Sequence, residues 1–132
     1  MRKLIFLALT GIAMCLNQAK AQNNSNKIYD FTSLEKVPDY PGGIKKFYEF
    51  LGREIKYPEI AKKNSTQGKV FASFVVEKNG ALTDIQITKG LTKETDEEAL
   101  RVLNKSPRWN PGLLNGKPVR VKYNINVNFS MN

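Results

Sequence analysis

Eleven consecutive residues near the C-terminal end of the chain, 119–129, alternate strictly between apolar and polar side chains. A period of two is typical of a β-strand that turns one face toward a core and the other toward solvent. The apolar face is predicted to hold Val119, Val121, Tyr123, Ile125, Val127 and Phe129, and the polar face Arg120, Lys122, Asn124, Asn126 and Asn128. A chain with such a strand must build a sheet with at least one buried face.

The rest of the chain predicts three helices and two more strands. Apolar residues recur every three to four positions from Ile44 to Ile55, which is helical spacing. Pro58 suits the first turn of a second helix, in which Ile60 and Ala61 would be buried. The predicted helices span 44–55, 58–64 and 95–105, and the predicted strands span 70–76, 82–88 and 119–129.

Short motifs mark where these elements begin and turn. Asn79-Gly80 is the pair favoured in tight hairpins, because both residues can take a positive φ, and it joins the first two strands. Thr95 and Glu98 have the spacing of a capping box at the start of the third helix. The turn-rich stretch 108–118, which holds the only tryptophan, is predicted to be a loop.

These elements favour one α+β domain. Strands and helices with one apolar face each pack as two layers around a core, and one-sided strands favour an antiparallel sheet. We therefore expect helices packed on one face of a three-stranded antiparallel sheet.

Residues 1–21 have the pattern of a secretory signal peptide. A short basic start precedes an apolar run at 4–16, and the small residues Ala19 and Ala21 fit a cleavage site. The apolar run is shorter than the roughly 20 residues that span a bilayer. We expect export with cleavage after about Ala21; the alternatives are lipid attachment at Cys15 and retention of the segment as a membrane anchor.

The composition argues against catalysis. The chain has no histidine, and its only cysteine is Cys15. Ser–His and Cys–His nucleophile pairs are therefore absent, and zinc lacks its usual ligands. The acidic run Asp96-Glu97-Glu98 is explained by the positive end of a helix dipole. We expect no enzymatic activity, no metal and no cofactor.

The formal net charge of +9 would suit an acidic partner. Phe71, in a strand among lysines, could stack a nucleic-acid base, but packing within the sheet explains it as well. Export makes nucleic acid an unexpected partner.

The strand 119–129 also suggests peptide binding. An edge strand presents unpaired amides and carbonyls, and an extended peptide can add to it as a further strand. The alternative is that its polar face is simply solvated, and the pattern alone does not decide between the two.

With these elements placed, the chain resembles the C-terminal domain of the TonB family of energy transducers. The resemblance covers about residues 37–130 and rests on motifs that occur in order. They are "PDYPGG" at 38–43, Tyr57-Pro58 with Ala61 and Gly68-Lys69-Val70, the Asn-Gly hairpin in 74–87, and the helix, Trp-x-Pro loop, Asn-Gly-Lys-Pro-Val turn and last strand in 97–129.

The resemblance implies a role in the Gram-negative periplasm. Such domains bind the TonB box, a short extended segment of outer-membrane receptors, and transmit force derived from the inner-membrane proton gradient. The box would pair with the last strand of the sheet. The implied docking residues are Lys56, Tyr57, Pro58, Arg120, Val121, Lys122, Tyr123, Asn124, Ile125, Asn126, Val127 and Asn128. Trp109 and Pro111 match the Trp-x-Pro motif and are interpreted as core and loop-shaping residues.

The chain also departs from a full transducer of this family. A full member has a retained membrane helix and a long proline-rich spacer, whereas residues 22–36 contain no proline and reach about 50 Å when extended. We divide the chain into a signal peptide (1–21), a flexible N-terminal segment (22–36), in which Ile28, Tyr29 and Phe31 could pack as a short strand, and a TonB C-terminal-like domain (37–132).

We therefore expect an accessory or partial transducer that contributes to transport across the outer membrane. The proton-motive-force complex of the inner membrane would be reached through another protein, and two domains could also form a homodimer through their strand edges. The alternative is an envelope scaffold whose basic face binds cell-wall polymer or a multi-protein complex.

Overall fold

The computed structural model describes residues 26–131, so the predicted signal peptide, Cys15 and the cleavage site lie outside the described residues. The chain forms five strands, three α-helices and one 3-10 helix within the described residues. In order they are β1 (Ile28–Tyr29), the 3-10 helix η1 (Phe31–Ser33), α2 (Ile44–Glu54), α3 (Glu59–Lys63), β2 (Gly68–Val76), β3 (Leu82–Lys89), α4 (Lys93–Leu103), β4 (Gly112–Leu114) and β5 (Lys117–Phe129).

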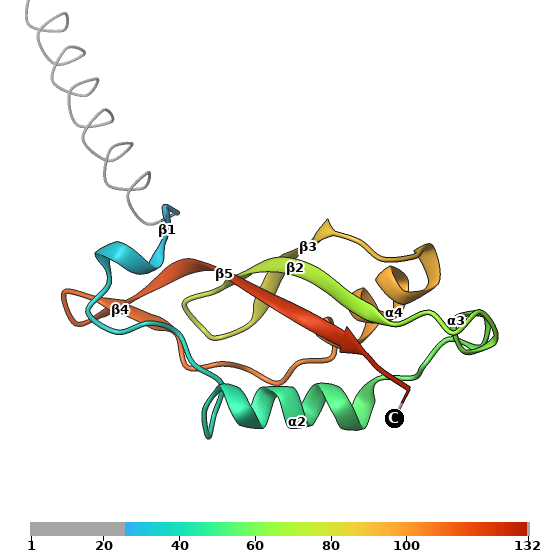
Figure 1. The fold of residues 1–132 in the computed structure, drawn as a ribbon. Coiled ribbons are helices and arrows are strands. Elements are labelled where there is room, and N and C mark those ends of the chain that lie inside the picture. Colours follow the sequence, from blue (N-terminus) through green and yellow to red (C-terminus); the bar gives the residue numbers. More distant parts are fainter. Residues whose placement is uncertain (1–25, 132) are drawn as a thin grey trace, which may run out of the picture.

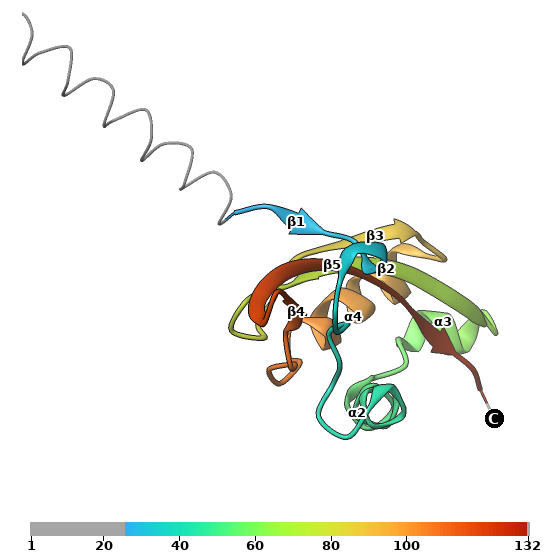
Figure 2. The ribbon, with the colours of Figure 1, turned by 90° about the vertical axis from the view of Figure 1, so that its left-hand side faces the viewer.

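The strands form one curled sheet in the order β1-β5-β2-β3, with β4 also paired to β5 (Figure 1). Residues 121–129 of β5 pair antiparallel with 76–68 of β2, and β2 pairs antiparallel with β3. The helices α2 and α4 lie on the concave side of this sheet (Figure 2). The α+β class with helices on one face is therefore as expected.

The predicted three-stranded antiparallel sheet is wrong in two respects. The sheet has five strands, and β1 runs parallel to β5. Ile28 and Tyr29 form the short strand expected in the N-terminal segment, but Phe31 begins η1 instead of extending it. Strand β4 was missed, because it lies in the stretch 108–118 predicted to be a loop and its three residues are too few to show a period of two. The β4–β5 turn did carry a signal, since Asn115 (φ 52°) and Gly116 (φ 73°) form the kind of tight turn that Asn-Gly favours.

The predicted start of the last helix is also wrong. Thr92, not Thr95, is the N-cap, and the two threonines form the capping box. Glu98 instead accepts a hydrogen bond from the Lys56 amide, 42 residues away. A long-range contact therefore uses the side chain that the sequence pattern assigned to the cap.

Two local predictions fail in detail. Ala61 is buried, but Ile60 is 49% exposed because α3 has little more than one turn and shows the core only one side. In the β2–β3 turn only Gly80 has a positive φ, and the strands are joined by the five residues 77–81 rather than by a two-residue turn.

Trp109 is the centre of the core. Its side chain is 2% exposed, and its ring lies 4.8 Å from that of Phe47 on α2 and 4.9 Å from that of Tyr123 on β5. The rings of Phe74 and Tyr40 lie at 5.5 and 5.9 Å. The indole N–H donates to the Ser106 hydroxyl, so no polar atom of the side chain is left unpaired. The interpretation of Trp109 as a core residue is confirmed.

The β2–β3 turn is held against the tryptophan by a close backbone approach. Gly80 has φ +86°, its carbonyl accepts the Trp109 amide at 2.8 Å, and a Cβ at this position would overlap the Trp109 carbonyl oxygen. Only glycine meets both conditions.

We predict that Gly80→Ala lowers the free energy of unfolding by about 3 kcal/mol, through left-handed strain and displacement of the Trp109 backbone. Gly116→Ala is the matched control, because Gly116 also has a positive φ but nothing within 4 Å of the place that a Cβ would take; it should cost only about 1 kcal/mol. Urea unfolding measures both, and equal losses would show that the close approach to Trp109 does not matter.

Candidate functional site

The two edges of β5 are paired to different extents. One edge pairs with β2 throughout 121–129, whereas the other pairs with β1 only at Arg120 and Val121. Among the described residues 26–131, no strand pairs with this second edge from Lys122 to Phe129. The expected free edge therefore exists, but it is shorter than the predicted stretch 119–129, because β1 pairs with it at Arg120 and Val121.

The alternation of β5 is as predicted. Val121, Ile125, Val127 and Phe129 are buried and Tyr123 is half-buried. The side chains between them, Lys122, Asn124, Asn126 and Asn128, are exposed or half-buried on the other face.

An apolar hollow of about 220 Å³ lies between α2 and the far end of β5. Val127 and Asn128 of β5 line it, and α2 and the residue that follows it contribute Tyr48, Leu51, Gly52 and Ile55. Tyr48 is 42% exposed, so its ring can meet a ligand. A strand added to the free edge of β5 would have this hollow beside it and could place a side chain there.

Sequence reasoning missed the α2 side of this hollow. Tyr48 and Gly52 share one side of α2, since they lie four positions apart. A conspicuous signal was available in Gly52, which interrupts an otherwise regular helical pattern.

The three candidate residues 56–58 lie together beside α4, and Tyr57 also packs against the end of β5. The Tyr57 ring packs edge-on against that of Phe129 at 5.7 Å, and its hydroxyl donates to the Thr66 carbonyl, so Tyr57 supports the end of β5 from the core side. On the other side, Lys56, Tyr57 and Pro58 all line a hollow of about 400 Å³ together with side chains of α4. The structure does not bring Lys56 and Pro58 to the free edge.

Glu98 fixes the position of residues 55–58, the linker between α2 and α3. It accepts the Lys56 amide at 2.5 Å, and it accepts Nε and Nη2 of Arg101, both at 2.7 Å. Arg101 also donates to the Glu54 carbonyl at 2.9 Å. Burial by itself would raise the pKa of Glu98, but the hydrogen bonds from Arg101 and Lys56 outweigh it and lower the pKa. The end of α2, the linker and α4 are thus joined through one carboxylate.

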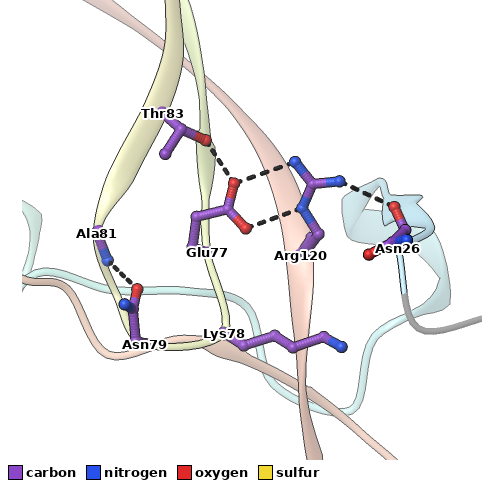
Figure 3. A pocket seen from close by; sticks show the side chains of 7 residues that line it. All are labelled: Asn26, Glu77, Lys78, Asn79, Ala81, Thr83 and Arg120. Carbon is purple, nitrogen blue, oxygen red and sulfur yellow. Dashed lines mark hydrogen bonds and ion pairs between the residues drawn. The ribbon is translucent and has the colours of Figure 1, made fainter.

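A second ion pair, between Arg120 and Glu77, lies near the N-terminal end of β5. Arg120 donates from Nε and Nη2 to the Glu77 carboxylate at 2.8 and 3.1 Å, and Thr83 also donates to this carboxylate (Figure 3). The hydrogen bond from Arg120 is the main cause of a lowered Glu77 pKa. These residues line a hollow of about 560 Å³, into which the remaining Arg120 nitrogen projects and donates to the Asn26 carbonyl at 2.9 Å.

Tyr123 connects the core to the edge. Its ring is stacked on Phe74 at 5.7 Å, meets Trp109 on the core side and contacts Phe31 at 5.1 Å on the other. Burial raises its pKa, so its hydroxyl is neutral at physiological pH.

Within residues 26–131, no group of three or more histidine, cysteine, aspartate or glutamate side chains is placed to hold a metal ion. In the same part of the chain, no helix has the length and apolar character needed to cross a membrane.

Comparison with known proteins points to one family. The family model for the Gram-negative bacterial TonB protein C-terminal matches residues 53–131. No curated protein matches the chain.

Three solved structures are similar. A longer solution structure of the C-terminal domain of Helicobacter pylori TonB has a TM-score of 0.52 and 21% identity, over 67% of this chain and 80% of that one. A shorter structure of the same domain has a TM-score of 0.50 and 23% identity, over 66% and 91%. The C-terminal domain of Pseudomonas aeruginosa TonB has a TM-score of 0.47 and 23% identity, over 58% and 78%. At these identities the structural likeness shows the fold alone.

The lowered pKa values of Glu77 and Glu98 predict loss of stability in acid. Each carboxylate is held below its ordinary value of 4.5 in the folded chain, so it stabilises the fold above pH 4.5. This contribution is lost as the pH falls through 4.5 toward the lower folded value. After allowance for solvent screening we expect about 1 kcal/mol from each.

Urea unfolding at pH 7 and pH 3 measures this effect. Glu77→Gln and Glu98→Gln should each lower stability at pH 7 and reduce the difference between the two pH values. Glu59→Gln is the control, because its side chain is 91% exposed and its lysine partner lies on the surface. An unchanged pH dependence in both test variants would contradict the assignment.

Proposed function

The chain belongs to the family of Gram-negative TonB C-terminal domains, and from this premise we propose that it binds TonB-box segments of outer-membrane receptors by strand addition to β5. Membership implies a TonB-like role in transport, and domains of this family are non-enzymatic. The receptor segment would be an added strand on the edge of β5 that β2 does not occupy.

The observation that carries the proposal is the free edge of β5 beside an apolar hollow. From Lys122 to Phe129 this edge has no strand partner within residues 26–131, so its outward amides and carbonyls are available to another chain. Main-chain pairing supplies affinity for any extended peptide, and a pocket for alternate side chains supplies selectivity. The hollow lined by Tyr48, Gly52 and Val127 is such a pocket, and its apolar lining favours an aliphatic or aromatic side chain.

The docking residues proposed from this geometry differ in part from those implied by the sequence. The stretch 122–128 of β5 stays in the proposed site, and Tyr48, Gly52 and Ile55 join it. Lys56, Tyr57 and Pro58 line the other hollow, on α4, so the proposal gives them no direct contact with the added strand.

The proposal places the protein in the periplasm as an accessory or partial transducer. Cleavage after about Ala21 would separate the domain from the apolar run at 4–16. Any force on a bound receptor would then have to come through another protein. N-terminal sequencing of the exported protein tests this part, and an N-terminus at Met1 would contradict it.

Titration of the isotope-labelled chain with synthetic peptides that span receptor TonB boxes tests docking. We predict amide shifts along 122–128 and at Tyr48, Gly52 and Ile55, which persist when salt is raised to about 0.5 M, because main-chain pairing is poorly screened. No shifts along β5 at millimolar peptide would refute docking there. Shifts that spread over the lysines and vanish at high salt would instead favour a scaffold that binds through its basic surface.

Filling the hollow should block docking without harm to the fold. Gly52 lies in α2 with nothing within 4 Å of the place that a Cβ would take, so Gly52→Leu can be accommodated and gains helix propensity of up to about 1 kcal/mol. We predict that its leucine occupies the hollow and weakens peptide binding at least tenfold. Gly52→Ala is the matched control, because it gives a similar helix gain but leaves the hollow open. Equal affinities of the two variants, measured by calorimetry, would show that the hollow takes no part.

A further inference from the structure

The edge of β5 that we propose for docking is already paired, over a short stretch, with β1 of the same chain. Ile28 and Tyr29 of β1 pair in parallel with Arg120 and Val121. Phe31 follows, and its ring contacts the Tyr123 ring at 5.1 Å with an interplanar angle of 63°. Residues 26–31 thus lie against β5 from 120 to 123, directly before the free part of the same edge.

The Glu77–Arg120 pair holds the start of this segment. Two guanidinium nitrogens are fixed by Glu77, which itself accepts from Thr83, and the third nitrogen donates to the backbone carbonyl of Asn26 (Figure 3). A backbone carbonyl is present at every residue of a peptide. Arg120 therefore recognises the position and direction of an extended chain and not the identity of the side chain.

The segment is held by few contacts. Only two residues of β1 are paired, and the side chains of Ile28 and Phe31 are each 44% exposed. After Tyr29 the strand ends, because the Asp30 carboxylate accepts the Thr32 amide and turns the chain into η1. The next backbone hydrogen bonds to the sheet join 35–36 to Leu113, so residues 26–33 can leave β5 while that link remains.

We propose that residues 26–31 occupy the binding position of the receptor segment on β5. The receptor segment displaces residues 26–31 and then pairs with β5 over its full length. The inference rests on the proposed function, because both occupants use the same edge. It also gives the partner a direction and a chemistry. The partner runs parallel to β5, presents a backbone carbonyl to Arg120 and sets an apolar or aromatic side chain against Tyr123.

When an internal segment occupies a site, the apparent association constant of a competitor equals its intrinsic value multiplied by the fraction of time for which the site is free. The full chain with Ile28→Gly, Tyr29→Gly and Phe31→Ala together loses the strand preference and the aromatic contact but keeps every residue of β5. We expect this triple variant to bind a TonB-box peptide about three- to tenfold more tightly than the unchanged chain, corresponding to an edge that is free for about a third to a tenth of the time. Ile60→Ala is the control, because it removes a similarly exposed apolar side chain from α3 and should leave the affinity unchanged.

Calorimetry with the peptide, together with amide hydrogen exchange along β1, distinguishes the outcomes. Tighter binding by the triple variant, and loss of exchange protection at the β1 amide that faces β5 when the unchanged chain binds peptide, support the inference. Binding of equal strength to both chains, or protection that persists in the complex, overturns it and leaves the proposed function standing. If neither chain binds, the proposed function fails and the inference with it; if only the triple variant binds, both are supported.

Discussion

The antiparallel pairing of β5 with β2 over nine consecutive positions is the contact on which the rest of the structure depends. It turns Val121, Ile125 and Val127 toward the helices and places Tyr123 against Trp109. Trp109 in turn contacts α2 through Phe47 and the β2–β3 turn through Gly80. Because β2 uses one edge of β5 from Val121 to Phe129, anything that binds this part of β5 further must do so at the other edge.

That other edge is open to a partner, but it is also protected against aggregation. Unpaired strand edges promote aggregation, and natural proteins cover them or place charged and polar side chains beside them. Here β1 covers the positions at Arg120 and Val121, and the solvent face of the free part carries Lys122, Asn124 and Asn128. The asparagines, uncommon in strands, fit an edge that should accept one extended partner without a strong preference for pairing with copies of itself.

Long periodic segments were predictable from the sequence, and contacts between distant segments were not. The alternation over 119–129, the helical stripe of α2 and the hairpin of β2 and β3 each extend over enough residues to define a period. Strand β4 is too short for that, although Asn115-Gly116 marked the turn before β5. Strand β1 was expected from Ile28 and Tyr29, but its pairing with β5 was not. The N-cap of α4 was predicted at the wrong residue, because Glu98 accepts a hydrogen bond from the distant Lys56 amide and not from the start of its own helix. Such a contact becomes visible only in the folded chain. The hollow beside β5 combines Tyr48 and Gly52 of α2 with Val127, which lies far along the chain, so the interruption of the helical pattern at Gly52 could mark only its α2 side.

The central claim is that a receptor segment adds to β5 along the edge opposite β2. The most direct test is the measurement of intermolecular nuclear Overhauser effects between the isotope-labelled chain and an unlabelled TonB-box peptide. We expect backbone-to-backbone effects from the peptide to residues 122–128, in the order of a parallel strand, with side-chain effects to Tyr48. Effects confined to the hollow lined by Lys56, Pro58 and α4, with none along β5, would contradict it.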